Sequence, residues 1–478
     1  MQRKFMTLLR REANLKKIFF ILVLLVGFSF LHAVDFDPYR LQDPFKKGHS
    51  VGLSLFPVYQ GQNTLFEVDA YGTFSFDAFA FGILIPVRFL LHNNDNVETT
   101  AGVFPKDDWD EARDWIAWLN FFQYGHKDDL FYFYFGEHEN RYIGNGSILG
   151  AYYNSIKLNF PKRGVNVGVN TDYAGFDFFM DDVSPPNIIG GRAYVKPFSF
   201  LSKDCYANNI EIGATYLLDV FSPYDIEVEN NGGIYGRDID SVVDVVWGID
   251  ISMKFVSTEI YQMRFYTDFN TISEAGSGFH FGIDHSFDLP TETDIKIKSR
   301  WEYRLMEANY IPQYFNTFYD VEREYYRNGE TKSFHVGSKA IDPDSFNLDW
   351  NHGYYLDLVF DLTGTFSVGG SFEHNRIYAD RPIDVFNSYQ VNIFTNARLF
   401  EKFGIDFVMT FQNVVDKDLK EAPFFKLHGM YFINEYFTVG FQAESRWYLR
   451  SRGIGLNTEY YYDSSAFYSL GGYGAIRF

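Results

Sequence analysis

The segment TDIKIKSRWEYRL, residues 293–305, alternates between two kinds of side chain. The apolar and aromatic face carries Ile295, Ile297, Trp301, Tyr303 and Leu305, and the charged face carries Asp294, Lys296, Lys298, Arg300, Glu302 and Arg304. Successive side chains of a β-strand point to opposite sides, so the pattern predicts a strand whose faces meet different environments. A soluble sheet with one solvated face can show the same alternation, and the rest of the chain must decide between the two.

The same alternation recurs along most of the chain. It is present in residues 209–219, 243–255, 388–399, 402–413 and 436–449, and in the last of these Glu444 and Arg446 lie on the polar face. A soluble sandwich rarely repeats strands of this length. Segments of about ten alternating residues are typical of transmembrane β-barrels. We therefore expect the apolar face to contact lipid, and its predicted members include Trp247, Ile251, Ile297, Ile405 and Phe441.

The connections between these strands alternate between long and short. Counted back from the C-terminus, the pattern holds over eleven strands and includes a very long connection over residues 307–350. Barrels of bacterial outer membranes pair short periplasmic turns with longer external loops. Further strands are predicted near 50–59, 63–76, 79–90, 129–136, 164–172, 174–182 and 188–197, with one more around 148–158 as an alternative. The fold class is all-β, a transmembrane antiparallel up-and-down β-barrel of about 18 strands (range about 16–20), with one short helix in a loop.

The N-terminus predicts export. Residues 1–17 carry six basic residues and one acidic residue, and the apolar run from Ile18 to Phe30 follows them. This is the order of a secretory signal, and the 13 apolar residues are fewer than the roughly 20 of a membrane-spanning helix. We predict a signal peptide over residues 1–33, cleaved after Ala33 or alternatively after Ser29, and a barrel over residues 34–478. An uncleaved inner-membrane anchor is the other interpretation.

Composition excludes several classes of protein. Without residues 1–33 the chain has 36 basic and 61 acidic residues, a formal charge of −25. This charge argues against nucleic-acid binding, which requires Lys and Arg to neutralise phosphates. The single cysteine, Cys205, excludes an intramolecular disulfide framework.

The C-terminal segment YSLGGYGAIRF resembles the last strand of bacterial outer-membrane β-barrels. In that class the terminal Phe, with apolar or aromatic residues at alternate preceding positions, is recognised by the barrel-assembly machinery. The matching positions are Tyr468, Leu470, Ile476 and Phe478, whereas Gly472 and Gly474 stand where larger side chains are common. The resemblance covers roughly residues 48–478 and implies the outer membrane of a Gram-negative bacterium, with its lipid and the assembly machinery as partners. It points to a class and carries over no functional residue.

Three segments depart from the strand pattern. Residues 105–129 have helical spacing of Trp109, Trp115 and Leu119, which predicts a helix at the rim of the barrel or, alternatively, a plug in the lumen. Residues 136–154 predict an irregular strand or an inward loop, with a gate or a metal site as the alternative. The connection over residues 307–350 is too long for a simple turn, and loops of such length are usually functional or disordered.

No catalytic or metal-binding motif is present in the sequence. The ten His residues after residue 33 are scattered, and neither G-x-S-x-G nor H-E-x-x-H occurs. We therefore predict no catalytic residue, no metal site and no cofactor, and an outer-membrane enzyme is the least favoured function.

The charged face of residues 293–305 provides the candidate lumen residues. Lys296, Lys298, Arg300 and Arg304 form one inward row, and neighbouring strands offer Asp284, Asp288, Asp357 and Asp361. Opposite charges on paired strands attract, so the row is either a ladder of ion pairs or, where unpaired, a track that contacts anions. Glu444 and Arg446 are further candidates for the lumen lining.

Two functions remain open from the sequence. The first is a porin-like channel for small solutes with an acidic lumen and long extracellular loops, because barrels of about 16–18 strands enclose an aqueous channel. The second is a structural or surface-binding outer-membrane protein without an open pore. The sequence identifies neither the solute nor the oligomeric state.

Overall fold

The computed structural model describes residues 48–477 apart from several gaps. The gaps are residues 61–62, 94–97, 128, 157–161, 202–205, 232–233, 274, 291–294, 308–309, 323–325, 328–329, 332–350, 363–365, 379–384, 400–401, 413–423, 435–436 and 453–458. The predicted signal peptide and Phe478 lie outside the described residues. No helix among the described residues is long and apolar enough to cross a membrane.

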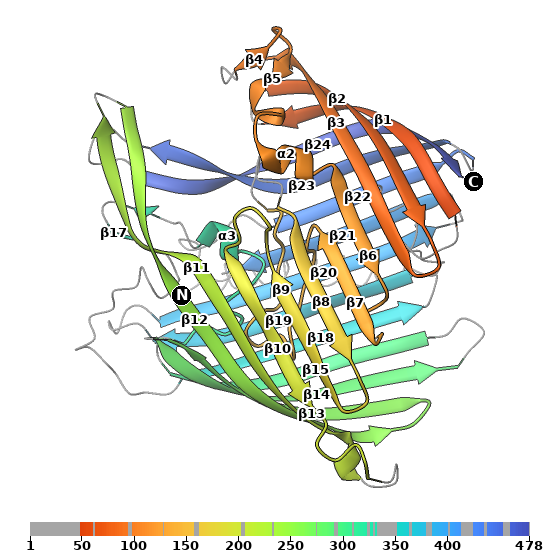
Figure 1. Ribbon diagram of the computed structural model, residues 1–478, viewed down its shortest axis with the longest axis vertical. Coiled ribbons are helices and arrows are strands. Elements are labelled where there is room, and N and C mark those ends of the chain that lie inside the picture. Colours follow the sequence, from red (N-terminus) through yellow and green to blue (C-terminus); the bar gives the residue numbers. More distant parts are fainter. Residues whose placement is uncertain are drawn as a thin grey trace, which may run out of the picture.

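Among the described residues, twenty strands form the wall of the molecule, and Figure 1 shows their arrangement. They are β1 (Gly48–Gln60), β2 (Asn63–Ser75), β3 (Phe79–His92), β6 (Leu119–Tyr124), β7 (Phe131–Gly136), β8 (Gly164–Asn170), β9 (Ala174–Met180), β10 (Ile188–Val195), β11 (Ile210–Asn231), β12 (Ile234–Ser257), β13 (Tyr261–Ile272), β14 (Gly276–Leu289), β15 (Ile295–Met306), β18 (Asn351–Leu362), β19 (Phe366–Tyr378), β20 (Val385–Leu399), β21 (Phe403–Gln412), β22 (Phe424–Phe432), β23 (Phe437–Arg452) and β24 (Glu459–Arg477).

The remaining elements are short and lie in the connections. They are β4 (Thr99–Thr100), β5 (Phe104–Pro105), the 3-10 helix η1 (Lys106–Asp108), α2 (Ala112–Ile116), η2 (Tyr206–Asn209), α3 (Tyr319–Glu322), β16 (Tyr326–Arg327) and β17 (Glu330–Thr331).

Each wall strand pairs antiparallel with the next one along the chain, and β24 pairs with β1. The register of this last pair aligns Ser50 with Arg477 and Tyr59 with Tyr468. The ladder of pairings therefore returns to the strand at which it begins. The predicted fold class is confirmed. The even number of wall strands, twenty, lies at the upper end of the expected range and agrees with the parity of bacterial barrels.

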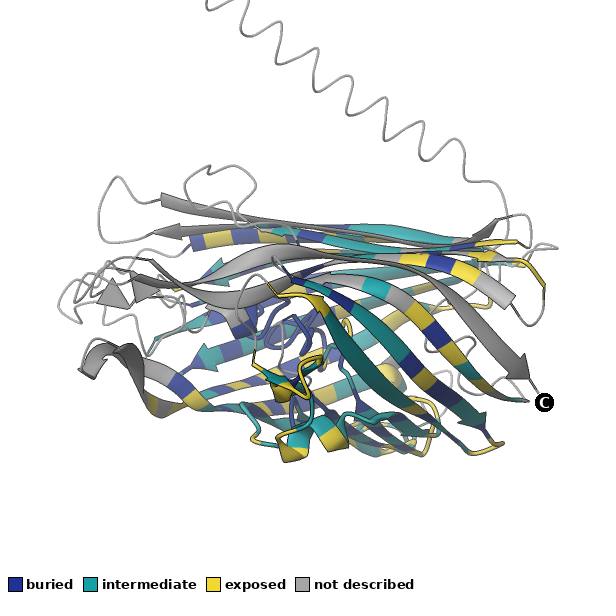
Figure 2. Ribbon diagram, turned by 90° about the horizontal axis from the view of Figure 1, so that it is seen from above, coloured by how far each residue is buried: buried dark blue, intermediate teal, exposed yellow. Residues whose placement is uncertain are grey.

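The two faces of the wall have opposite chemistry. Large apolar side chains are exposed on the outside, among them Trp301 (59 % exposed), Leu358 (58 %) and Ile251 (48 %). On the inner face, polar side chains such as Asp250, Asp268 and Glu302 are buried, and Figure 2 shows this alternation of exposed and buried positions along the strands. An outward apolar face on a closed sheet is the arrangement that hydrocarbon requires, since it leaves no unpaired sheet edge in lipid.

Replacing Ile251 by arginine is expected to destabilise the barrel by about 2–4 kcal/mol, the cost of a charge on the lipid face at mid-depth. Ile251 is opposite Thr267, midway along β13. Urea titration in a reversible lipid-vesicle folding assay measures the change. The matched control is Ile433→Arg, because Ile433 is 54 % exposed beyond the end of β22, where the cost falls to about 0–1 kcal/mol. Equal effects of the two substitutions would contradict the assigned strand phase.

The predicted short helix within residues 105–129 is present, but it covers less of that segment than the apolar spacing indicated. Residues 119–124 form β6 and not part of a helix, and α2 covers only Ala112–Ile116. The apolar spacing in this region reflects a cluster in which Trp109, Trp115 and Trp118 contact one another. A cluster of this kind imitates helical periodicity without a long helix. Residues 148–156 form an irregular buried segment and not the alternative strand, whose last positions lie outside the described residues.

The connection between the alternating segments 209–219 and 243–255 is a paired hairpin and not an open loop. β11 and β12 continue as a paired hairpin to the positions Asn231 and Ile234. The register shifts between Asp219 and Ser222 and again between Pro223 and Asp225. Irregularities of this type bend a strand, so the outer part of the hairpin can depart from the direction of the wall.

Candidate functional site

Two connections fold into the barrel and not away from it. The first is residues 137–156, between β7 and β8, and the second is residues 310–320, between β15 and β18; together we call them the plug. Figure 2 shows buried chain inside the wall, and most residues of both segments are buried. This confirms the prediction of an inward loop within residues 136–154.

Backbone hydrogen bonds join the two segments of the plug. Gly150 N donates to Phe315 O (3.1 Å), Phe315 N donates to Ile148 O (3.1 Å) and Gln313 N donates to Ser147 O (2.8 Å). In addition, Thr317 Oγ1 donates to Ala151 O (2.7 Å). Neither segment has extended secondary structure of its own, so each satisfies part of its buried backbone through the other.

An apolar cluster fixes the plug against one side of the wall. Ile148, Leu149 and Tyr152 from the first segment pack with Tyr314, Phe315 and Tyr319 from the second. The wall residues of the same cluster are Phe179, Ile188, Leu217, Val246, Ile272 and Met306, which come from β9 through β15. These inward apolar positions interrupt the otherwise polar inner face at the level of the plug.

Polar contacts connect the plug to wall strands on separate sides of the lumen. On the side of β13, Asn145 Nδ2 and Ser147 Oγ donate to the two oxygens of Asp268 at 2.7 Å and 2.6 Å. In β22, Lys426 Nζ pairs with Glu137 at 3.2 Å and Glu139 at 2.5 Å. β13 and β22 are separated by seven positions in the order of wall strands. The plug therefore spans the interior and does not merely line one side.

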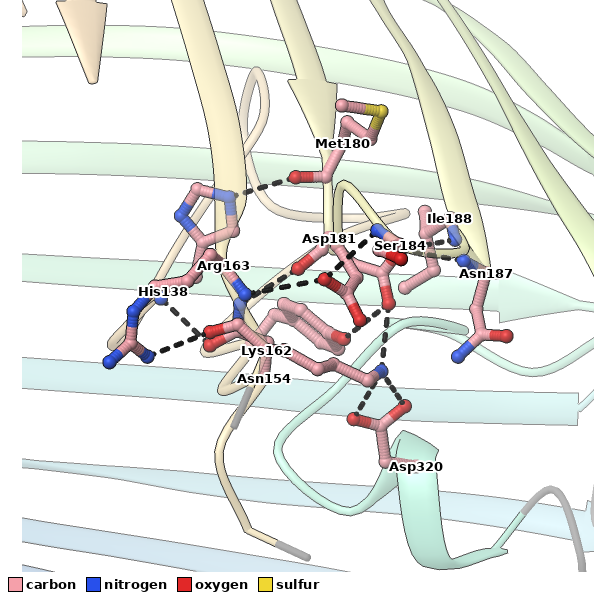
Figure 3. Close-up of polar contacts among 12 residues, drawn as sticks. His138, Asn154, Lys162, Arg163, Met180, Asp181, Ser184, Asn187, Ile188 and Asp320 are labelled. Atoms are coloured by element: carbon pink, nitrogen blue, oxygen red, sulfur yellow. Dashed lines mark hydrogen bonds and ion pairs between the residues drawn. The ribbon is translucent and has the colours of Figure 1, made fainter. Parts of the chain in front are cut away.

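A buried ion triad anchors the plug (Figure 3). Lys162 Nζ lies 2.8 Å from Asp181 Oδ2 and 2.8 Å from Asp320 Oδ2. Lys162 precedes β8, Asp181 follows β9, and Asp320 belongs to α3 in the second segment. Burial by itself lowers the pKa of Lys162, but the two carboxylates raise it above its ordinary value. Lys162 is therefore charged and links three separate connections.

Asp181 and His138 extend this anchor. The other oxygen of Asp181 accepts hydrogen bonds from the backbone N–H groups of Asn187 and Ile188, both at 2.8 Å. His138 is fully buried, and its Nε2 lies 3.0 Å from Met180 O. Burial, assisted by Arg141, lowers the pKa of His138 to about 3. The imidazole is therefore neutral and donates its Nε2–H to the carbonyl, a structural role.

A cavity of about 490 Å³ lies beneath the plug. Its roof is formed by Asn140, Tyr142 and Gly144 of the first segment. Its wall includes Lys254, Arg264, Asp284, Lys298, Arg300, Tyr355 and Asp357. Lys254 and Arg264 lie close to the β12–β13 connection, on the side of the barrel where β1 begins and β24 ends. The cavity thus occupies the half of the lumen on the side of the termini.

Within the described chain, the predicted row of Lys296, Lys298, Arg300 and Arg304 contains both paired and unpaired side chains. Arg300 Nε donates to Asp284 Oδ1 (2.8 Å) and Arg300 Nη1 donates to Asn145 O (2.6 Å). Asp284 also accepts from Arg264 Nε at 2.9 Å. Lys298 is exposed and forms no ion pair with a described residue.

The other members of the row stand in register with acidic residues. Lys296 is aligned with Asp288 on β14 and with Asp361 on β18, and Arg300 is aligned with Asp357. Arg304 is 1 % exposed and pairs with Glu302 and Glu373 at 2.5 Å and 2.8 Å. Its carboxylate partners therefore differ from the four aspartates expected from the sequence.

The remaining predicted residues fall largely outside the described part. Glu444 and Arg446 belong to β23, and Tyr468, Leu470 and Ile476 to β24, but their side chains lie outside the described residues, as does Phe478. Among the residues that the structure describes, no cluster of His, Cys, Asp or Glu could hold a metal ion.

Several residues of the site were missed by the sequence reasoning. Lys254 and Arg264 lie on the polar faces of alternating strands, so the same rule that selected Lys298 could have found them. Lys162, Asp181 and Asp320 lie in connections, where no periodicity indicates which side chains meet. Their sequence separations from one another, up to 158 residues, carry no local signal.

Comparison with known proteins adds structural likeness only. No family model and no curated protein matches the sequence. OccK9 (OpdG) of Pseudomonas aeruginosa is 8 % identical over 90 % of this chain and 98 % of its own, with a TM-score of 0.32. Wzi of Escherichia coli, an outer-membrane carbohydrate-binding β-barrel, is 9 % identical over 90 % of this chain and 84 % of its own, with a TM-score of 0.35. The ferric enterobactin receptor PfeA is 8 % identical over 91 % of this chain and 82 % of its own, with a TM-score of 0.35.

Proposed function

We propose that this chain, a β-barrel of the bacterial outer membrane, is a porin-like channel that passes small solutes through a lumen narrowed by the plug. The observation that carries the proposal is the combination of a twenty-stranded wall with a cavity of about 490 Å³ beneath the plug. Wall side chains fill a barrel of about eight strands, whereas about 16–18 strands enclose an aqueous channel. A wall of this size therefore has room for a solute path in addition to the plug.

Reconstitution of the purified full-length protein into a planar lipid bilayer tests this function. Discrete conductance steps support a channel. A folded barrel that stays silent at all voltages contradicts it, and the heat-modifiable shift on electrophoresis verifies the fold in the same preparation.

A second function is favoured by one observation, the contact of the plug with opposite sides of the wall. A plug attached in this way suits a structural or surface-binding outer-membrane protein without an open pore. In that case the long β11–β12 hairpin would provide a surface for a partner. The silent but folded barrel described above is the result that this alternative predicts.

Ion selectivity provides a further prediction. The net charge of −25 after residue 33 leads us to expect mild cation preference, which weakens as added salt screens it. Replacing Lys296, Lys298 and Arg300 together by glutamine removes three positive charges from the proposed lumen and should strengthen that preference, as charged rings do in selective pores. Reversal potentials in a salt gradient measure the effect.

The outcome separates a lumen lining from a ladder of ion pairs. An unchanged reversal potential with lowered stability would assign the three residues to the wall alone. An anion-selective wild-type channel would contradict the proposed acidic lumen.

A further inference from the structure

We propose that the cavity beneath the plug is a binding site for a small organic dianion, with Lys254 and Lys298 as its two anchoring groups. This inference deepens the channel function proposed above and rests on it for its physiological meaning. The binding itself is a property of the folded barrel, whether or not the barrel conducts.

The charges of the cavity lining leave two cations uncompensated. The lining contains four basic side chains, Lys254, Arg264, Lys298 and Arg300, and two acidic ones, Asp284 and Asp357. Asp284 accepts hydrogen bonds from both arginines. Within the described chain, neither lysine has an ion pair or a hydrogen bond. The lining therefore carries an excess of two positive charges inside a protein that is strongly acidic.

Contacts with Asp284 and with the plug hold the cavity wall beside the two lysines in a fixed position. Arg300 is held by Asp284 on the neighbouring strand β14 and by the carbonyl of Asn145 in the plug, and it also lies over the ring of Tyr266 at 5.4 Å. The two lysines are exposed and retain all three N–H donors each. An incoming anion meets preformed arginine pairs and two free ammonium groups, so binding requires no ion pair to break.

The size and the remaining lining favour an organic ligand. A volume of about 490 Å³ lies within the range of about 300–1,000 Å³ for small-molecule sites, and it is far larger than a chloride ion needs. Tyr142 and Tyr355 add aromatic surface, and Asn140 adds an amide. A short carbon skeleton with two negative charges, carried by two carboxylates or by one phosphate ester, satisfies both the charge and the volume. Carboxylates and phosphate esters share this chemistry.

Isothermal titration calorimetry on the full-length barrel in neutral detergent tests the site. Succinate and glycerol 1-phosphate are the dianionic probes, and succinamide, which has the length of succinate but no charge, is the control ligand. We expect at least one dianion to bind and succinamide not to bind. Lys254→Gln and Lys298→Gln should each weaken binding about five- to tenfold, since a hydrogen bond to a charged group is lost.

The matched control variant is Lys402→Gln. Lys402 is exposed in the connection before β21, so the substitution removes the same charge outside the cavity and should leave the dissociation constant unchanged. Binding of succinate alone identifies the site with carboxylates, and binding of glycerol 1-phosphate alone identifies it with phosphate esters. The proposal is overturned if neither dianion binds, if succinamide binds equally, or if Lys402→Gln weakens binding as much as Lys298→Gln.

The channel and the binding site fail in different experiments. If the bilayer shows no conductance but dianions bind in a lysine-dependent way, the channel function is contradicted and the binding site is supported. If conductance steps appear but no dianion binds, the channel function is supported and the binding site is contradicted.

Discussion

Replacement of Lys162 by methionine is expected to release the plug and raise the conductance of the barrel. Lys162 is the shared cation of two buried carboxylates, Asp181 and Asp320, which are 0 % and 1 % exposed. Removing one partner of a buried ion pair typically costs about 3–5 kcal/mol, because the other charge stays buried without compensation. Undocking returns Asp320 to water, so this cost is a driving force for release. A shift of this size changes the ratio of docked to released plug by a factor of roughly 100 or more.

Single-channel recording and hydrogen exchange measure the release separately. The variant should show a larger conductance level, and the amides of residues 137–156 and 310–320 should exchange faster while those of β12 to β15 keep their protection. Accelerated exchange over the whole wall would indicate general destabilisation and would contradict local release of the plug.

Two variants control for the loss of charge. Lys106→Met removes a lysine whose side chain is 56 % exposed and 2.9 Å from Glu98, and exposed pairs are worth about 0–1 kcal/mol. It should leave conductance unchanged. Asp320→Leu combined with Lys162→Met removes one of the two uncompensated carboxylates and should restore part of the docking, since apolar replacement of a buried pair is often tolerated.

Deletion of residues 476–478 is expected to cause the second large effect, loss of the folded barrel from the outer membrane. Ile476 is aligned with Val51 and Arg477 with Ser50, at the end of the pair that joins β24 to β1. The deletion leaves part of both strands without a partner, and unpaired backbone groups in hydrocarbon cost several kcal/mol each. It also removes Phe478, the terminal position of the proposed assembly signal.

The heat-modifiable band in outer-membrane fractions measures assembly. Phe478→Ala should lower the amount of folded protein in the same direction, with the wall pairings intact. Tyr173→Ala is the matched control, since it truncates an aromatic side chain that is 65 % exposed between β8 and β9. Normal levels of the folded deletion variant would show that assembly requires neither the end of the β24–β1 pair nor the terminal Phe.

The wall could be predicted from the sequence because its signal is periodic and local. Alternation in residues 293–305 places Lys298 and Arg300 on one face of the strand, and both line the cavity. The same rule could not separate Arg304 from Lys298, although one is fully buried and the other exposed. Their difference depends on Glu302 and Glu373 and on how close the plug approaches each position.

The plug could not be predicted because its contacts are remote and aperiodic. Residues 136–154 could be predicted to turn inward, but Leu149 meets Phe315 across more than 160 residues of sequence. Helical spacing overestimated the length of the helix within residues 105–129 for a related reason. There, three tryptophans pack on one another, and strand pairing of β6 with β3 and β7 overrides the local pattern.

The reciprocal hydrogen bonds between the two plug segments have a consequence for kinetics. If the segment containing Phe315 leaves, Gly150 N loses its acceptor and Ile148 O loses its donor, so the remaining segment cannot stay behind at low cost. The two segments should therefore leave and return as one cooperative unit. A current trace from this barrel should then jump between two well-separated levels, with exponentially distributed dwell times, and should not drift through intermediate values.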